Sequence, residues 1–124
     1  MLFRSLDQIR QRYPEPPRGI SAMQKLIGEL STDLDSLGVF NMLLSDSRYL
    51  YAYCSTKLCW ITRRAPFGEA RLIDADMAVD FQQETTDKDV VSVVATRPLT
   101  DNEQWNSLQK GQLAVFNKGE VRIR

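Results

Sequence analysis

The chain has 124 residues, with 16 Lys or Arg and 16 Asp or Glu, so its formal net charge at pH 7 is zero. A chain of this length fits one domain and would bury roughly two-thirds of its unfolded surface around a single core. Balanced charge provides no long-range positive field to attract a polyanion, so we expect no nucleic-acid partner. Every apolar run is shorter than about 18 residues, and no basic region precedes an apolar one at the start. We therefore expect no membrane partner, no signal peptide and a cytoplasmic location.

The histidine and cysteine content excludes several classes of catalytic and metal site. The chain has no histidine, so it cannot form a Ser-His-Asp or Cys-His arrangement or a histidine metal site. Cys54 and Cys59 are too sparse for a disulfide framework and lack the further ligands of a zinc site. Both lie in strand patterns, so we interpret them as reduced, buried side chains rather than nucleophiles. With no Walker or dinucleotide glycine motif either, we expect no metal and no cofactor.

Apolar residues at three- and four-residue spacing predict two helices. The first covers residues 2–12 and has no capping residue before it, which suits either a frayed surface helix or the tail of something longer. The second runs from Ile20 to Leu37, with Ser21 or a neighbour as its N-cap and Gly38 at the C′ position. We expect this second helix to pack across a sheet.

Seven or eight strands are predicted after the helices. Residues 39–44 and 49–54 form a hairpin around 45–48, and 58–62 joins them in an antiparallel meander. Alternation places Tyr49, Tyr51 and Tyr53 on one face of the second strand, with Leu50, Ala52 and Cys54 on the other. Residues 70–73 and 77–81 are outlying strands, and 84–89 is a polar loop. The β-branched run 90–95 predicts a central strand. Trp105 is expected to be a buried ring. Residues 111–116 and 121–124 are expected to form a final hairpin.

Helices followed by antiparallel strands indicate an α+β fold with the two N-terminal helices packed on one face of a mainly antiparallel sheet. Val93, Trp60, Tyr51 and Phe116 make the second face too apolar for water. We expect another layer to cover it, from this chain or from a partner.

One pair of charged residues is a candidate binding site. Arg63 and Arg64 stand at a strand end before a proline-containing turn, where two guanidinium groups can hold a carboxylate or phosphate. Adjacent strand residues point to opposite sides, however, so the alternative is one arginine pairing with a surface acid and the other remaining solvated. Two acidic pairs, Asp74 with Asp76 and Asp87 with Asp89, are interpreted as solvated turns.

Several segments together resemble a known family. They are residues 38–46 (GVFNMLLSD), 52–58 (AYCSTKL), 60–68 (WITRRAPFG) and 93–100 (VVATRPLT), followed by Glu103 and Trp105. In this order they resemble the C-terminal half of the class II glutamine amidotransferases, and most of all the small stand-alone proteins of the YafJ type. Ser47 replaces a glycine usual in the family, and Cys59 a histidine common in close relatives.

The resemblance implies an Ntn hydrolase with an αββα sandwich, in which an N-terminal cysteine attacks the glutamine side-chain amide and its free α-amine serves as the base. That cysteine cannot be Met1. The family's substrate-binding arginine and its Asn-Gly and Thr-Asp segments also have no matching positions in this sequence. Residues 1–124 are therefore expected to be a single partial domain, a truncated transferase with no catalytic residues and no activity alone.

Its expected partners are an N-terminal half supplied in trans or further copies of the chain, with glutamine bound only by a complete domain. The alternative is a non-catalytic binding or scaffold module that pairs through an apolar sheet face.

Overall fold

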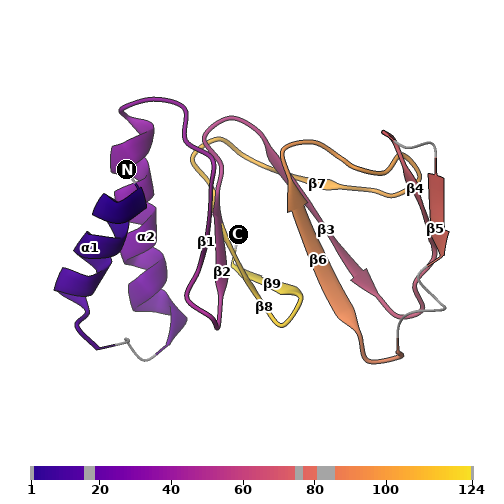
Figure 1. The fold of residues 1–124 in the computed structure, drawn as a ribbon, viewed down its shortest axis with the longest axis horizontal. Coiled ribbons are helices and arrows are strands. Elements are labelled where there is room, and N and C mark those ends of the chain that lie inside the picture. Colours follow the sequence, from indigo (N-terminus) through magenta and orange to yellow (C-terminus); the bar gives the residue numbers. More distant parts are fainter. Residues whose placement is uncertain (1, 16–18, 75–76, 81–85, 124) are drawn as a thin grey trace.

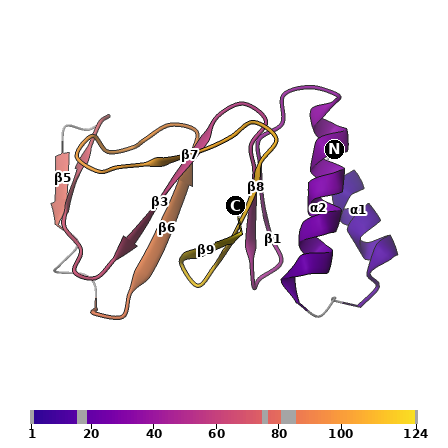
Figure 2. The ribbon, with the colours of Figure 1, turned by 180° about the vertical axis from the view of Figure 1, so that it is seen from behind.

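The computed structural model describes residues 2–15, 19–74, 77–80 and 86–123, arranged in four successive layers (Figure 1). The helical layer holds α1 (Leu2–Arg12) and α2 (Ile20–Asp35). Sheet A has the order β1 (Met42–Ser45), β2 (Leu50–Tyr53), β8 (Leu113–Asn117), β9 (Glu120–Ile123). Sheet B has the order β6 (Val90–Ala95), β3 (Leu58–Arg64), β7 (Asn106–Leu108). An outer hairpin of β4 (Glu69–Leu72) and β5 (Met77–Asp80) follows. The same succession is seen from behind in Figure 2.

The helical layer matches the predicted positions of both helices but differs at the ends of α2. The N-cap is Gly19, with φ 86° and no side-chain cap bond, so Ser21 lies inside the helix and the predicted serine cap is wrong. At the other end Ser36 is the C-cap and is still right-handed, with φ −64°. Gly38 therefore stands two residues beyond the cap rather than at C′. None of the described helices is long and apolar enough to cross a bilayer.

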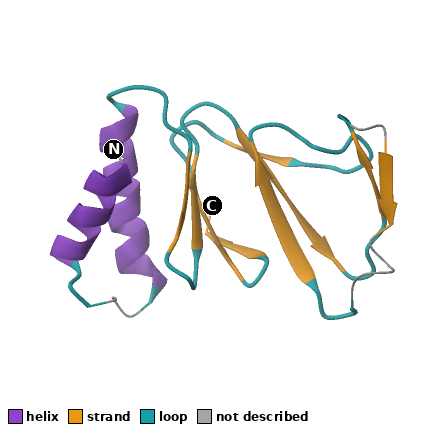
Figure 3. Cartoon of the chain, in the orientation of Figure 1, coloured by secondary structure: helices purple, strands orange, loops and turns teal. Residues whose placement is uncertain are grey.

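The helices cover one face of sheet A. Tyr51 is fully buried and Tyr53 nearly so, and both pack with Met23 and Ile27 of α2. Ala52, one position along, faces the opposite way, toward sheet B. The predicted alternation of the tyrosine strand is thus confirmed, and Figure 3 shows both helices on the same side of the strands.

The predicted three-stranded meander is wrong. β2 pairs with β1 and with β8, with Tyr51 opposite Val115, whereas β3 enters sheet B between β6 and β7. The reason is packing, because Leu58 and Trp60 belong to the core between the two sheets. A strand beside β2 in sheet A could not place those side chains over the face of that same sheet.

The central strand is also different from the predicted one. Residues 90–95 do form a strand, β6, but it is an edge of sheet B and its side chains are half-buried or exposed, Val91 by 44%. β3 occupies the centre. A β-branched run suits a strand with one packed face as well as one with two. β7 was not predicted, and Trp105 is only partly buried.

The core between the sheets covers Trp60 and Phe116 of the apolar face that the sequence indicated, whereas Tyr51 packs against α2 on the opposite face of sheet A. Trp60 of sheet B meets Phe116 of sheet A edge-on, with ring centroids 5.8 Å apart. This chain thus supplies the second layer itself over β2 and β8. The two predicted hairpins are confirmed by the β1–β2 and β8–β9 pairings, and the predicted outlying strands are β4 and β5, which pair with each other. Residues 81, 84–85 and 124 of the predicted strands and loop, and Asp76, lie outside the described residues.

Candidate functional site

The two candidate arginines end β3 and bind different acids. Arg63 donates two hydrogen bonds to Glu103, from Nε to Oε2 at 2.8 Å and from Nη2 to Oε1 at 2.6 Å. Arg64 donates a hydrogen bond from Nη1 to Oε1 of Glu120, in β9, at a distance of 2.5 Å. The Arg63 pair is largely buried, with side-chain exposures of 15% and 18%, whereas the Arg64 side chain is 59% exposed. The structure therefore does not bring the two guanidinium groups together as one clamp.

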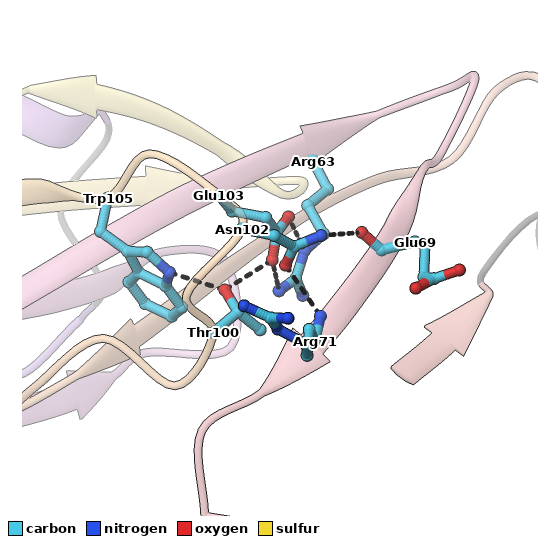
Figure 4. A network of polar contacts seen from close by, with 7 residues as sticks. All are labelled: Arg63, Glu69, Arg71, Thr100, Asn102, Glu103 and Trp105. Carbon is cyan, nitrogen blue, oxygen red and sulfur yellow. Dashed lines mark hydrogen bonds and ion pairs between the residues drawn. The ribbon is translucent and has the colours of Figure 1, made fainter. Parts of the chain in front are cut away.

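Glu103 accepts from one further side chain, Thr100, which Trp105 in turn holds in place, as Figure 4 shows. Thr100 donates its hydroxyl to Glu103 Oε1 at 2.8 Å, and Trp105 donates Nε1–H to Thr100 Oγ1 at 2.9 Å. The Arg63 guanidinium keeps the pKa of Glu103 below its usual range, with a smaller contribution from Thr100. Glu103 is thus an ionised acceptor near neutral pH and does not act as a general acid there.

The same loop is bound to the outer hairpin through β4. Asp101 accepts from Arg71 Nε at 2.7 Å, and Asn102 accepts from the Arg71 backbone N–H at 2.8 Å. Asn102 also donates to the carbonyl of Glu69 at 2.6 Å. The whole network therefore joins β3, the loop 97–105 and β4, and its hydrogen-bonding groups mainly serve one another.

The cysteines lie away from this network, and among the described residues each thiol makes its hydrogen bond to a backbone carbonyl rather than to a base. Cys54 is fully buried, with Sγ 3.7 Å from the carbonyl of Leu108, and Cys59 is 5% exposed with Sγ 3.4 Å from the carbonyl of Ala95. Both thiols are free. Burial raises the pKa of Cys59, which disfavours the reactive thiolate. Within the ranges that the structure describes, no group of three or more metal-binding side chains comes together.

Two hollows flank the turn between β1 and β2. One, of about 250 Å³, lies between that turn and the helices and is lined mainly by apolar groups such as Ile9, Tyr13 and Met23. The other, of about 220 Å³, lies between that turn and the β8–β9 turn and is more polar. Asp46 stands at the first and accepts from the Tyr51 hydroxyl at 3.3 Å. Burial and this carboxylate raise the pKa of Tyr51, so the phenol stays protonated.

Comparison with known proteins identifies the family of this chain. The family model described as glutamine amidotransferases class-II matches residues 1–124. The chain belongs to the class II glutamine amidotransferases. The sequence resemblance is thereby confirmed.

Individual relatives support the same assignment. YafJ of Escherichia coli (strain K12), assigned as a glutamine amidotransferase, is 53% identical over 115 residues, covering 93% of this chain and 45% of YafJ. A Haemophilus influenzae protein with the same assignment is 38% identical over 94 residues, 76% of this chain and 32% of that protein. A crystal structure from Pseudomonas aeruginosa PA01, also so assigned, matches with TM-score 0.84 and 46% identity over 97% of this chain and 47% of that one. The chain thus spans about half the length of YafJ and of the crystal structure, whose match confirms the α+β fold.

One cluster of polar side chains was not predicted from the sequence. Asp35, at the end of α2, accepts from the Tyr53 hydroxyl at 2.9 Å and from the buried Ser55 hydroxyl. The Ser55 bond, and next the Tyr53 bond, lower the pKa of Asp35. A carboxylate in the last turn of a helix faces the negative end of the helix dipole, so its position was a signal that a compensating donor would be present.

Proposed function

We propose that this chain forms the C-terminal part of a glutamine amidotransferase domain, which as a whole hydrolyses the side-chain amide of glutamine and transfers the ammonia to an acceptor. Membership of the class II family supports the reaction. The proposal assigns the chain the role of a packed scaffold, two layers of sheet under two helices, on which the remaining catalytic elements of a complete αββα domain assemble.

We propose further that these 124 residues have no glutaminase activity by themselves. The observation that carries this is the state of the two thiols. Cys54 and Cys59 are the cysteines of the chain, both are buried, and within the described residues each thiol is hydrogen-bonded to a backbone carbonyl and not to an amine. Amide hydrolysis by a cysteine needs an accessible thiolate with a base in hydrogen-bond reach and oxyanion donors, and loss of these removes many powers of ten in rate.

The test is ammonia release from glutamine by the purified chain. We expect none above the background of buffer and of a heat-denatured sample. Ammonia release that disappears in Cys54→Ser or Cys59→Ser would contradict both the inactivity and the buried state of the thiols. Release that persists in both variants would indicate a contaminating enzyme.

The reduced state of both cysteines supports a cytoplasmic location for the proposed enzyme, since that compartment keeps thiols reduced. Its partner in this proposal is the remaining half of the domain, supplied in trans or on the same polypeptide. Glutamine binds only when that half is present.

Arg63 and Arg64 enter the proposal as candidate contacts to an anionic or substrate-edge group. Arg64 suits this better, because its pair with Glu120 is exposed and can exchange partners at little cost. In a complete domain, Arg64→Gln should then raise KM and leave kcat unchanged, and an unchanged KM would remove Arg64 from the site.

The second candidate function is a binding or scaffold module without catalysis. The uncharged edge strand β1, with Leu43 52% exposed, favours pairing with another chain. The nucleotide sequence immediately upstream separates the two functions, because only the amidotransferase predicts a reading frame for an N-terminal half that starts Met-Cys.

A further inference from the structure

The more polar of the two hollows, of about 220 Å³, lies between two hairpin turns. These are the β1–β2 turn and the β8–β9 turn, and both lie at the same end of the molecule in Figure 1. The Asn117 side chain donates to the carbonyl of Arg48 at 2.7 Å and so joins one turn to the other. The polar side chains that line the hollow are Ser45, Ser47, Arg48, Ser92, Asn117 and Lys118. Among the described residues that line it, none is acidic.

The two basic side chains of this hollow, Arg48 and Lys118, have no acid to pair with. Among the described residues, neither of them forms an ion pair. The acids nearest to them in the sequence have other partners. Asp46 accepts from backbone N–H groups of its own turn, and Glu120 binds Arg64. Two cations that share a hollow without a neutralising carboxylate attract an anion.

Two hydroxyl groups of the β1–β2 turn add further donors. Ser45 Oγ accepts from the backbone N–H of Ser47 at 3.2 Å, so the Ser45 hydroxyl proton is available for a ligand. The Ser47 hydroxyl makes no hydrogen bond within the described part of the chain. A carboxylate offers two oxygens in one plane, whereas a phosphate group offers three strong acceptor oxygens in a tetrahedral arrangement. Donors that come from two separate turns therefore suit a phosphate group better.

The backbone of the two turns gives an independent reason to assign a ligand. Ser47, with φ 73°, and Lys118, with φ 51°, are the non-glycine residues with positive φ in the described part of the chain. Both line this hollow. The left-handed conformation is unfavourable for a residue with a Cβ, and hairpin turns usually place glycine or asparagine there. Such conformations cluster at ligand sites, so we infer that Ser47 and Lys118 are kept for their side chains.

We propose that this hollow binds a phosphate group, either as inorganic phosphate or as the monoester of a small metabolite. Arg48 and Lys118 supply the positive charge, and Ser45 and Ser47 donate to the remaining oxygens. The inference goes beyond the proposed function, because none of these residues takes part in the glutaminase proposal.

The experiment measures binding of inorganic phosphate to the full chain from NMR amide shifts at constant ionic strength. Glycerol phosphate and acetate are the comparison probes. The wild type is compared with Arg48→Gln, Lys118→Gly and Ser47→Gly, and with the control Lys57→Gln. Lys57 is an exposed lysine between β2 and β3, outside the hollow. The control removes the same charge as Lys118→Gly, so a general effect of net charge would move both variants alike.

We expect saturable shifts of the amides of residues 45–49 and 117–119. Arg48→Gln and Lys118→Gly should each weaken phosphate binding about tenfold, Ser47→Gly about threefold, and Lys57→Gln not at all. Because glycine adopts positive φ readily, neither glycine variant should lower the urea midpoint. Tighter binding of glycerol phosphate than of inorganic phosphate would identify a monoester as the ligand, and the reverse order would identify free phosphate.

Three binding results would overturn the proposal: no saturable shift with phosphate, an equal loss in Lys57→Gln and Lys118→Gly, or acetate bound as tightly as phosphate. A lower urea midpoint in Ser47→Gly or Lys118→Gly would overturn it as well. That result would show that these side chains serve the fold rather than a ligand.

Discussion

Replacing Gly119 with alanine should destabilise the protein by about 3 kcal/mol. Gly119 has φ 76° in the β8–β9 turn, and a left-handed conformation costs an L-residue roughly 1–2 kcal/mol. A Cβ at this position would also lie 2.0 Å from the carbonyl oxygen of Val90, so the turn must move away from β6. That movement breaks the bond from Ser92 to the Gly119 carbonyl, worth about 1 kcal/mol.

Gly111 is the matched control. It has φ 82°, and a Cβ there would meet nothing within 4 Å. Gly111→Ala should therefore lose only the conformational part, about 1 kcal/mol. The measurement is the free energy of unfolding from urea titrations of both variants and the wild type. Losses that agree within about 0.5 kcal/mol would refute the claim that the turn is packed against β6.

Three further predictions concern the polar network. Trp105→Ala should cost about 2 kcal/mol in urea titration, less than a fully buried ring, because the indole is only partly buried and the change leaves Thr100 without one donor; a cost under about 0.5 kcal/mol would show that the ring packs against nothing. Arg63→Ala should destabilise by about 2 kcal/mol because it leaves the part-buried Glu103 unpaired, whereas Arg64→Ala should have a clearly smaller effect because its side chain is exposed; equal losses would contradict the difference in burial. Because the pKa of Glu103 is lowered on folding, its contribution is present above the unfolded pKa and is lost as the pH falls through the folded pKa. The wild type should thus lose more stability than Glu103→Gln between about pH 5 and pH 3, and parallel pH profiles would rule this out.

The sequence predicts the elements of this fold better than their partners. Spacing of apolar residues gave both helices to within two residues, and alternation gave the facing of Tyr51 and Ala52, because these signals depend on neighbours a few positions away. The pairing of β2 with β8 depends instead on residues about sixty positions apart. Local patterns do not distinguish that pairing from the predicted meander.

For the candidate site too, the sequence shows the residues but not their partners. The adjacent arginines were visible in the sequence, but Glu103 and Glu120 lie 40 and 56 positions from their partners Arg63 and Arg64. The Arg64–Glu120 pair depends on how sheet B lies over sheet A, and the Arg63–Glu103 pair depends on how the loop 97–105 folds back on β3. The spacing of charges along the chain does not contain that information.

The late position of β8 in the chain determines when folding can finish. β8 pairs with both β2 and β9, and its Val115 and Phe116 enter the two cores on opposite faces of sheet A. Until residues 113–117 have been synthesised, β1 and β2 form only an isolated hairpin, which is marginally stable in water. The apolar faces of α2 and β3 then have no complete surface to pack on, and such pairings between distant segments form slowly. Truncation within β8 should therefore release unfolded material rather than a smaller domain.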